Sequence, residues 1–197
     1  LSENQLSGSI PTELGDLSNL EVLGLSGNQF YGGIPETFAK LSKLESFSYS
    51  NNQLSGVIPM WLSGHLSLEA INLSNNQLTG NIPLEFGGLN LYYLNLSNNQ
   101  LSGEIPSTMT NLTRLHWFYF DYTRLCEPNQ QSFRDWLASI SDVRRSGLIC
   151  GVSQTYKISG RVLDGADQPV SGVHVEIATG GIVVAEPTTD ASGNYTA

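Results

Sequence analysis

Along the first 125 residues, apolar and polar positions follow a pattern that returns about every 24 residues. The segment LSGNQFYGGIP begins at Leu25, and similar segments begin at Leu1, Tyr49, Leu73 and Leu96. The asparagine of the pattern occupies positions 4, 28, 52, 76 and 99, so successive steps are 24, 24, 24 and 23 residues. This period is typical of a solenoid, because each unit leaves an apolar edge that only a stacked neighbour covers.

Each copy predicts a short strand followed by a helical turn. In the second copy Leu23 and Leu25 alternate with Val22, which predicts a half-buried strand with its leucines inward. Stacked copies then form a parallel sheet. A proline at positions 11, 35, 59, 83 and 106 is expected at the first position of a helical turn, which buries pairs such as Phe38 and Leu41.

The turn after each strand leaves backbone groups that face inward without a strand partner. A buried asparagine side chain can bond both N–H and C=O groups there, so we predict a structural asparagine column. Its members are Asn4, Asn28, Asn52, Asn76 and Asn99. Glycines at positions 8, 33, 56, 80 and 103 are expected to ease the next bend, with Gly33 one place late.

Two copies depart from the pattern. In the third, His65 takes the place of Leu41 and Leu66 follows, which predicts a turn shifted by one residue. In the fourth, one residue is missing between Leu89 and Leu91.

After the fifth copy the pattern degrades. Thr123 stands where the asparagine would fall, and no Ile-Pro pair follows. Between 129 and 141 the apolar residues fall on one helical face: Phe133, Trp136, Leu137 and Ile140. We predict a helix that covers the end of the solenoid, within a cap of residues 126–150. A bond between Cys126 and Cys150 would attach this helix to the last repeat; the alternative is two unpaired buried thiols.

Beyond Cys150 the leucine pattern stops. Residues 155–181 alternate with period two, and LDGADQP and TDASGNY are turn segments. Residues 151–197 are therefore expected to form an antiparallel β-sandwich that is incomplete in this chain.

The repeats of residues 1–125 resemble the plant-type leucine-rich-repeat family, whose form is LxxLxLxxNxLSGxIPxxLxxLxxL. That resemblance implies a right-handed solenoid with a parallel sheet on its concave face and a second short strand around LSGxIP. It also implies recognition of proteins, peptides or glycans. Residues 126–150 resemble the C-terminal caps of secreted leucine-rich-repeat proteins, which implies an extracellular, oxidising location.

The segments SGRVLDGADQPVSGVHVEI and TTDASGNYTA resemble the carboxypeptidase-regulatory-like or Cna-B-like surface modules. Their family role is that of a spacer. The pairing of this module with the repeats looks like a bacterial secreted or surface multidomain protein; a plant-type receptor ectodomain is the alternative.

Charge and motifs narrow the functional classes. A net charge of −9 argues against nucleic acid, which needs a concentrated basic face. No apolar run is long enough for a membrane span. Nucleotide-binding and nucleophile motifs do not occur, so we expect no enzyme, cofactor or metal. The histidines, His65, His116 and His174, are expected to be solvated.

The outward strand positions carry the candidate site. Most hold Gly, Ser, Ala or Asn, but the later strands hold Tyr93, Trp117, Tyr119, Asp121 and Tyr122. Aromatic side chains anchor binding interfaces and stack on sugars, so these residues are predicted to bind the ligand. The alternative is that they pack against the cap or the sandwich. The sequence thus predicts a recognition scaffold; a structural stalk and an accessory module of a larger enzyme are the rival interpretations.

Overall fold

The computed structural model describes residues 1–151, 159–173, 175, 177–179, 182–185 and 187–196. The chain divides into two compact units, Leu1–Val152 and Ser153–Ala197.

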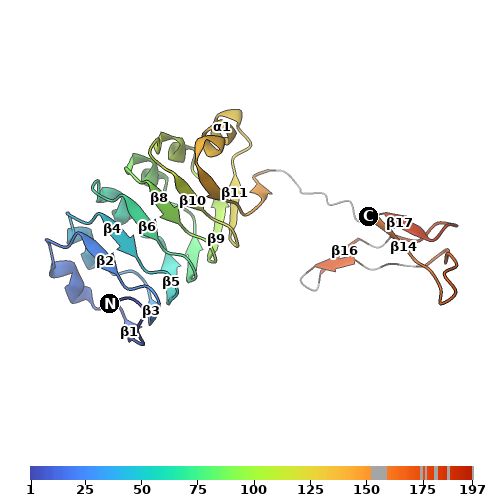
Figure 1. Cartoon of the computed structure of the whole chain (residues 1–197), viewed down its shortest axis with the longest axis horizontal. Coiled ribbons are helices and arrows are strands. Elements are labelled where there is room, and N and C mark those ends of the chain that lie inside the picture. Colours follow the sequence, from blue (N-terminus) through green and yellow to red (C-terminus); the bar gives the residue numbers. More distant parts are fainter. Residues whose placement is uncertain (152–158, 174, 176, 180–181, 186, 197) are drawn as a thin grey trace. The chain divides into compact units, whose positions relative to one another are not determined.

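The first unit is a solenoid in which most coils contribute one strand to each of two parallel sheets (Figure 1). The six-stranded sheet contains β2 (Val22–Gly24), β4 (Ser46–Ser48), β6 (Ala70–Asn72), β8 (Tyr93–Asn95), β10 (Trp117–Tyr119) and β12 (Asp142–Arg144). The seven-stranded sheet contains β1 (Ser7–Ser9), β3 (Gln29–Gly32), β5 (Gln53–Val57), β7 (Gln77–Gly80), β9 (Gln100–Glu104), β11 (Arg124–Glu127) and β13 (Leu148–Ile149).

The third side of each coil is helical. The 3-10 helices are η1 (Thr12–Asp16), η2 (Glu36–Lys40), η3 (Met60–Gly64), η4 (Leu84–Gly88) and η5 (Ser107–Asn111). Each begins directly after the repeat proline, which therefore lies at the N-cap and not at the predicted first helical position. The predicted solenoid with a parallel sheet and short helical turns is confirmed.

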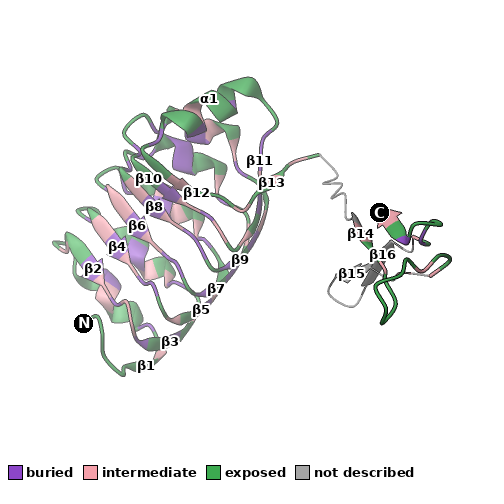
Figure 2. Cartoon of the chain, turned by 45° about the vertical axis from the view of Figure 1, so that its right-hand side comes forward, coloured by how far each residue is buried: buried purple, intermediate pink, exposed green. Residues whose placement is uncertain are grey.

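The core is a set of apolar columns that run between the sheets and the helices. The inward positions of β2, β4, β6, β8 and β10 are buried: Leu23, Phe47, Ile71, Leu94 and Phe118. Val22, the outward neighbour of Leu23, is 62% exposed, as the alternation predicts. Figure 2 shows buried segments recurring from coil to coil.

The predicted asparagine column is confirmed for four of its five members. The Asn76 Oδ1 accepts the N–H of Leu54 at 2.9 Å, and its Nδ2 donates to the carbonyls of Leu73 and Tyr49 at 3.2 and 2.9 Å. Equivalent bonds are made by Asn28, Asn52 and Asn99. The first member, Asn4, is exposed, and its side chain donates to the carbonyls of Leu1 and Ser2.

The glycine column needs one correction. The second copy places Gly32, and not Gly33, at the bend, with a φ of 84°. The other members are Gly8, Gly56, Gly80 and Gly103, all with positive φ. The glycine at the bend therefore recurs at the same intervals as the asparagine, because in-register strand pairing forces every coil to turn at the same place.

The predicted one-residue shift at His65 is wrong. Helix η3 has the same length as η2, and the N–H of His65 donates to Leu62 at 3.2 Å as that of Leu41 does to Phe38 at 3.0 Å. His65 is only 3% exposed, whereas Leu66 is 72% exposed. The imidazole fills the leucine site, because its Nε2 lies 3.0 Å from the Phe38 carbonyl and its Nδ1 lies 3.3 Å from the Trp61 carbonyl.

The expectation of solvated histidines is therefore wrong for His65. His116 is exposed, and His174 lies outside the described residues.

The shorter fourth copy changes the backbone at Leu89, whose ψ is 170° where Leu41 has 63°. The more extended backbone at Leu89 accompanies the missing residue.

A longer helix, α1 (Gln131–Ser139), takes the place of a 3-10 helix after β11. Its side chains Phe133 and Leu137 are fully buried in the solenoid core, and the predicted bond between Cys126 and Cys150 is present. The chain then continues both sheets, because β12 pairs with β10 and β13 pairs with β11. The sequence pattern showed neither of these strands.

The second unit contains antiparallel pairs. Strand β14 (Ser159–Arg161) pairs with β17 (Asn194–Thr196), and β15 (Ile177–Thr179) pairs with β16 (Ile182–Ala185). Antiparallel pairing agrees with the period-two alternation. Within the described residues these strands form two separate two-stranded sheets, so the predicted sandwich is not established.

Candidate functional site

The outward positions of the six-stranded sheet form columns, because the strands pair in register. One column reads Val22, Ser46, Ala70, Tyr93, Trp117 and Asp142. The next reads Gly24, Ser48, Asn72, Asn95, Tyr119 and Arg144. We call this surface the six-stranded face. The residues of this face are small and uncharged on β2, β4 and β6, and aromatic residues appear on β8 and β10.

Four rings gather at β8 and β10, and we call them the aromatic patch: Tyr92, Tyr93, Trp117 and Tyr119. The rings of Tyr92 and Trp117 meet edge to face at 5.8 Å, and those of Tyr93 and Tyr119 at 6.0 Å. The sequence reasoning missed Tyr92, which directly precedes β8. The sequence signal for Tyr92 was its position next to Tyr93, at the start of a predicted strand.

The patch is open to solvent in part. Trp117 is 37% exposed, and Tyr93 and Tyr119 are partly exposed. Trp136 of helix α1 does not cover these rings. Its ring centroid lies 6.2 Å from that of Phe118, on the core side of the sheet. Trp117 and Tyr119 therefore point away from the core, as predicted.

Strand β12 holds Tyr119 in place. The Tyr119 hydroxyl donates to Asp142 at 2.6 Å, and the Arg144 guanidinium lies 4.7 Å from the ring centroid. Partial burial, and then the bond to Asp142, raise the pKa of Tyr119 to about 12. Tyr119 is thus a fixed neutral phenol at neutral pH.

Asp121 and Tyr122 lie directly beyond the end of β10. Asp121 is half-buried, and its Oδ1 has no hydrogen-bond partner among the described residues. Tyr122 is 77% exposed and has a φ of 52°, in the left-handed region. The same place in the earlier coils also has a positive φ, and its residues are Glu3, Gly27, Asn51, Asn75 and Asn98. The glycine and the asparagines were a sequence signal for that conformation.

Amide and hydroxyl groups cover the face beside the patch. The Asn95 Oδ1 accepts from the N–H and the hydroxyl of Ser97 at 3.1 and 2.6 Å, and its Nδ2 donates to the Tyr93 hydroxyl at 3.2 Å. Asn72 and Ser74 repeat the first two bonds one coil earlier. These polar groups are largely held by one another.

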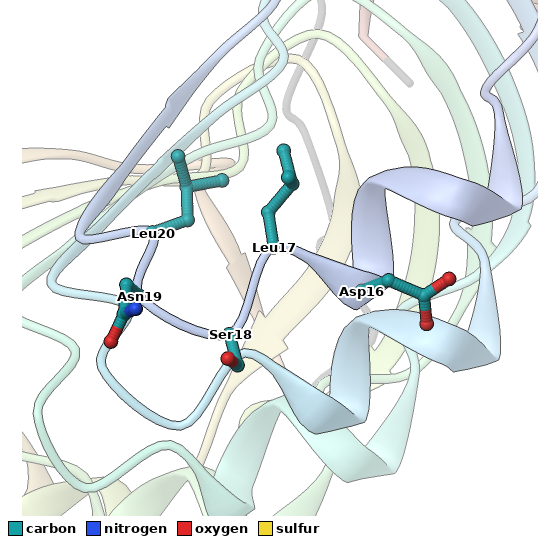
Figure 3. Close-up of a pocket in the computed structure, with 5 residues that line it drawn as sticks. All are labelled: Asp16, Leu17, Ser18, Asn19 and Leu20. Carbon is teal, nitrogen blue, oxygen red and sulfur yellow. The ribbon is translucent and has the colours of Figure 1, made fainter.

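No group of His, Cys, Asp and Glu that could hold a metal occurs among the described residues. An open pocket of about 440 Å³ lies on the first coil, lined by consecutive residues 16–20 (Figure 3). A second hollow of about 470 Å³ lies between the coils of β3 and β5 and is lined in part by Gly33, Val57 and Met60. Neither contains a residue of the predicted site.

Comparison with known proteins identifies the repeats. The family model described as Leucine Rich Repeat matches residues 19–41, 43–65, 67–89 and 90–112. The ectodomain of the receptor kinase SOBIR1 from Arabidopsis thaliana is 34% identical, with a TM-score of 0.61, over 64% of this chain and 68% of that one. The chain belongs to the leucine-rich-repeat proteins. Its repeats are of the plant receptor ectodomain type.

Two further structures are similar to this leucine-rich-repeat chain. The Arabidopsis receptor kinase HAESA, solved with the peptide hormone IDA and the co-receptor SERK1, is 38% identical over 77% of this chain and 26% of its own, with a TM-score of 0.68. The plant peptide hormone receptor RGFR1, solved with RGF2, is 36% identical over 64% of this chain and 20% of its own, with a TM-score of 0.60. The chain thus spans a fifth to a quarter of these two receptors.

No curated protein sequence matches the chain. Within the described part of the chain, no helix has the length and apolar character that a membrane crossing requires.

Proposed function

We propose that this chain is a non-catalytic recognition scaffold that binds a protein, peptide or glycan ligand at the aromatic patch of the six-stranded face. The observation that carries the proposal is the partly exposed Trp117, packed edge to face against Tyr92. A rigid exposed ring offers apolar area to a partner at little cost in side-chain entropy. The small residues of β2 to β6 offer little such area.

Two observations support an extracellular location. The chain contains the Cys126–Cys150 disulfide, and disulfides persist in oxidising compartments. The similar structures are described as a plant peptide hormone receptor, a receptor kinase in complex with a peptide hormone, and the ectodomain of a receptor kinase.

In this proposal residues 126–150, with α1, close the solenoid as its C-terminal cap. The buried Phe133 and Leu137 support that role, because they extend the core beyond the last repeat. Residues 151–197 serve as a spacer module of the carboxypeptidase-regulatory-like type. A stalk role for the whole chain and an accessory role in a larger secreted enzyme are the rival functions.

The proposal is tested by selecting binders to the whole chain from a random phage-displayed peptide library. Selected peptides should converge on the aromatic patch, because such libraries find binding hot spots. Most should bind Trp117→Ala at least 10-fold more weakly and should bind the control Val22→Ala, at the same column of β2, like the parent. Peptides that bind all three proteins equally would refute a hot spot at the patch.

A further inference from the structure

Four segments of the chain have the form Asn-X-Ser or Asn-X-Thr, which is the acceptor sequence of N-linked glycosylation. They begin at Asn72, Asn95, Asn111 and Asn194. An attached glycan is bulky and hydrophilic, so it must lie on the surface of the folded protein. The structure separates the four segments, because their side chains have different surroundings.

The segments of Asn72 and Asn95 lie on the six-stranded face, and their hydroxyl groups are enclosed. Ser74 is 5% exposed and Ser97 is 8% exposed. Each serine hydroxyl donates to the Oδ1 of the asparagine two residues earlier, at 2.8 Å for Ser74 and 2.6 Å for Ser97. The acceptor sequence requires this hydroxyl. Because the folded coil buries it, we expect neither asparagine to carry a glycan.

The segment of Asn111 lies at the end of η5 and is open. Asn111 and Thr113 are both exposed, and neither side chain has a hydrogen-bond partner among the described residues. Leu112, between them, is 2% exposed and belongs to the hydrophobic core. The amide and the hydroxyl that the acceptor sequence requires are therefore both accessible, on a turn whose middle residue is fixed.

The segment of Asn194 lies in β17 of the second unit. Asn194 is exposed, but it is paired with Arg161 of β14, and its Nδ2 lies 3.5 Å from Asp190 Oδ2. Its amide is therefore already in contact with an acceptor. Of the four segments, that of Asn111 combines an exposed amide and an exposed hydroxyl with no hydrogen bond to either group in the described part of the chain.

The turn at Asn111 recurs in another coil without the asparagine. Leu112 has a φ of −76° and a ψ of 71°, and Leu41 has a φ of −78° and a ψ of 63°. In both turns the residue after the leucine donates its N–H to the carbonyl of the residue before it, at 2.9 Å. Both are inverse γ-turns. The turn at Leu41 runs from Lys40 to the exposed Ser42, so it has the hydroxyl and lacks only the asparagine.

We propose that Asn111 is an N-glycosylation site, which accepts an oligosaccharide when the chain passes through a eukaryotic secretory pathway. The co-reactant is a lipid-diphosphate-linked oligosaccharide. Asn111 Nδ2 forms a bond to its anomeric carbon, the bond from that carbon to the diphosphate oxygen breaks, the lipid diphosphate leaves with the electron pair, and Nδ2 loses one proton. This inference rests on the proposed extracellular location. Asn111 belongs to none of the outward columns of the six-stranded face, so its glycan leaves those columns unmodified.

The test is expression of the whole chain behind a secretion signal in insect cells, with analysis of both the secreted and the membrane-enclosed protein. A peptide N-glycosidase releases the glycan and converts the acceptor asparagine to aspartate, which mass spectrometry identifies. Asn111 should be converted, whereas Asn72 and Asn95 should remain asparagine. Asn111→Gln and Thr113→Ala should each abolish the modification at this site, and Thr113→Ser, which keeps the hydroxyl, should retain it.

The role of the turn is tested by moving the acceptor to another coil. Lys40→Asn completes the sequence Asn-Leu-Ser at the end of η2 and should add a second glycan, because the backbone there matches that at Asn111. The matched control Lys40→Gln should add none. If Lys40→Asn stays unmodified while Asn111 is modified, the turn does not define the acceptor.

An unmodified Asn111 in both the secreted and the membrane-enclosed protein would overturn the inference. Conversion of Asn72 or Asn95 would overturn the argument from buried hydroxyl groups. Because the secretion signal is supplied, neither result affects the proposed recognition function, which the peptide selection tests. If Asn111 is glycosylated and no selected peptide depends on Trp117, the recognition function fails and the modification site stands.

Discussion

The substitution Asn76→Ala should destabilise the solenoid without touching the six-stranded face. The Leu54 N–H donates to Asn76 Oδ1 at 2.9 Å and would be left unpaired in the core. The carbonyls of Tyr49 and Leu73 each keep a second donor, Asn52 and Asn99, at 3.3 and 2.9 Å. One buried N–H is therefore orphaned, which costs about 1–3 kcal/mol.

For a unit of this size, a loss of about 2 kcal/mol lowers the melting temperature by roughly 4–8 °C. Thermal unfolding followed by circular dichroism measures this shift on the whole chain. The matched control is Asn4→Ala in the same column. The Asn4 side chain is exposed and donates to the exposed carbonyls of Leu1 and Ser2, so this variant should stay within about 0.5 kcal/mol of the parent. If Asn76→Ala melts like the parent, the asparagine column does not hold the coils together.

Three more predictions concern single features of the first unit. Alkylation of the unreduced protein should modify neither Cys126 nor Cys150, and mass spectrometry showing two alkylated cysteines would contradict the disulfide. Burial raises the pKa of Glu127 above its ordinary value, with Arg145 opposing the shift. Because the folded state then holds its proton more tightly, this group adds stability as the pH falls through the raised pKa and loses it as the pH rises. The free energy of unfolding of the parent should accordingly rise relative to that of Glu127→Gln from pH 7 to pH 4.5. A constant difference between the two proteins would refute the raised pKa of Glu127. Tyr49→Phe should leave the free energy of unfolding unchanged or raise it by up to about 1 kcal/mol, because the buried Tyr49 hydroxyl has no partner among the described residues; a clear loss in urea titration would show a hidden partner.

The solenoid could be predicted from the sequence alone. A 24-residue period, apolar alternation and a column of asparagines are local patterns, and each copy needs the next one to cover its edge. The same patterns placed Trp117 and Tyr119 outward, because side chains alternate strictly along a strand. The burial of His65 could not be predicted from such a pattern. Its polarity predicted exposure, whereas its two ring nitrogens lie near two backbone carbonyls in the structure.

The surroundings of the site depend on the three-dimensional fold. Asp142 and Arg144 follow a helix in the sequence, and only the pairing of β12 with β10 brings them to Tyr119. The unpaired oxygen of Asp121 is likewise a property of everything packed around it. Alternation along a strand depends on neighbours in the chain and can be read from sequence. Contacts between distant strands, and the burial of single polar atoms, depend on how the whole coil packs, which no local pattern specifies.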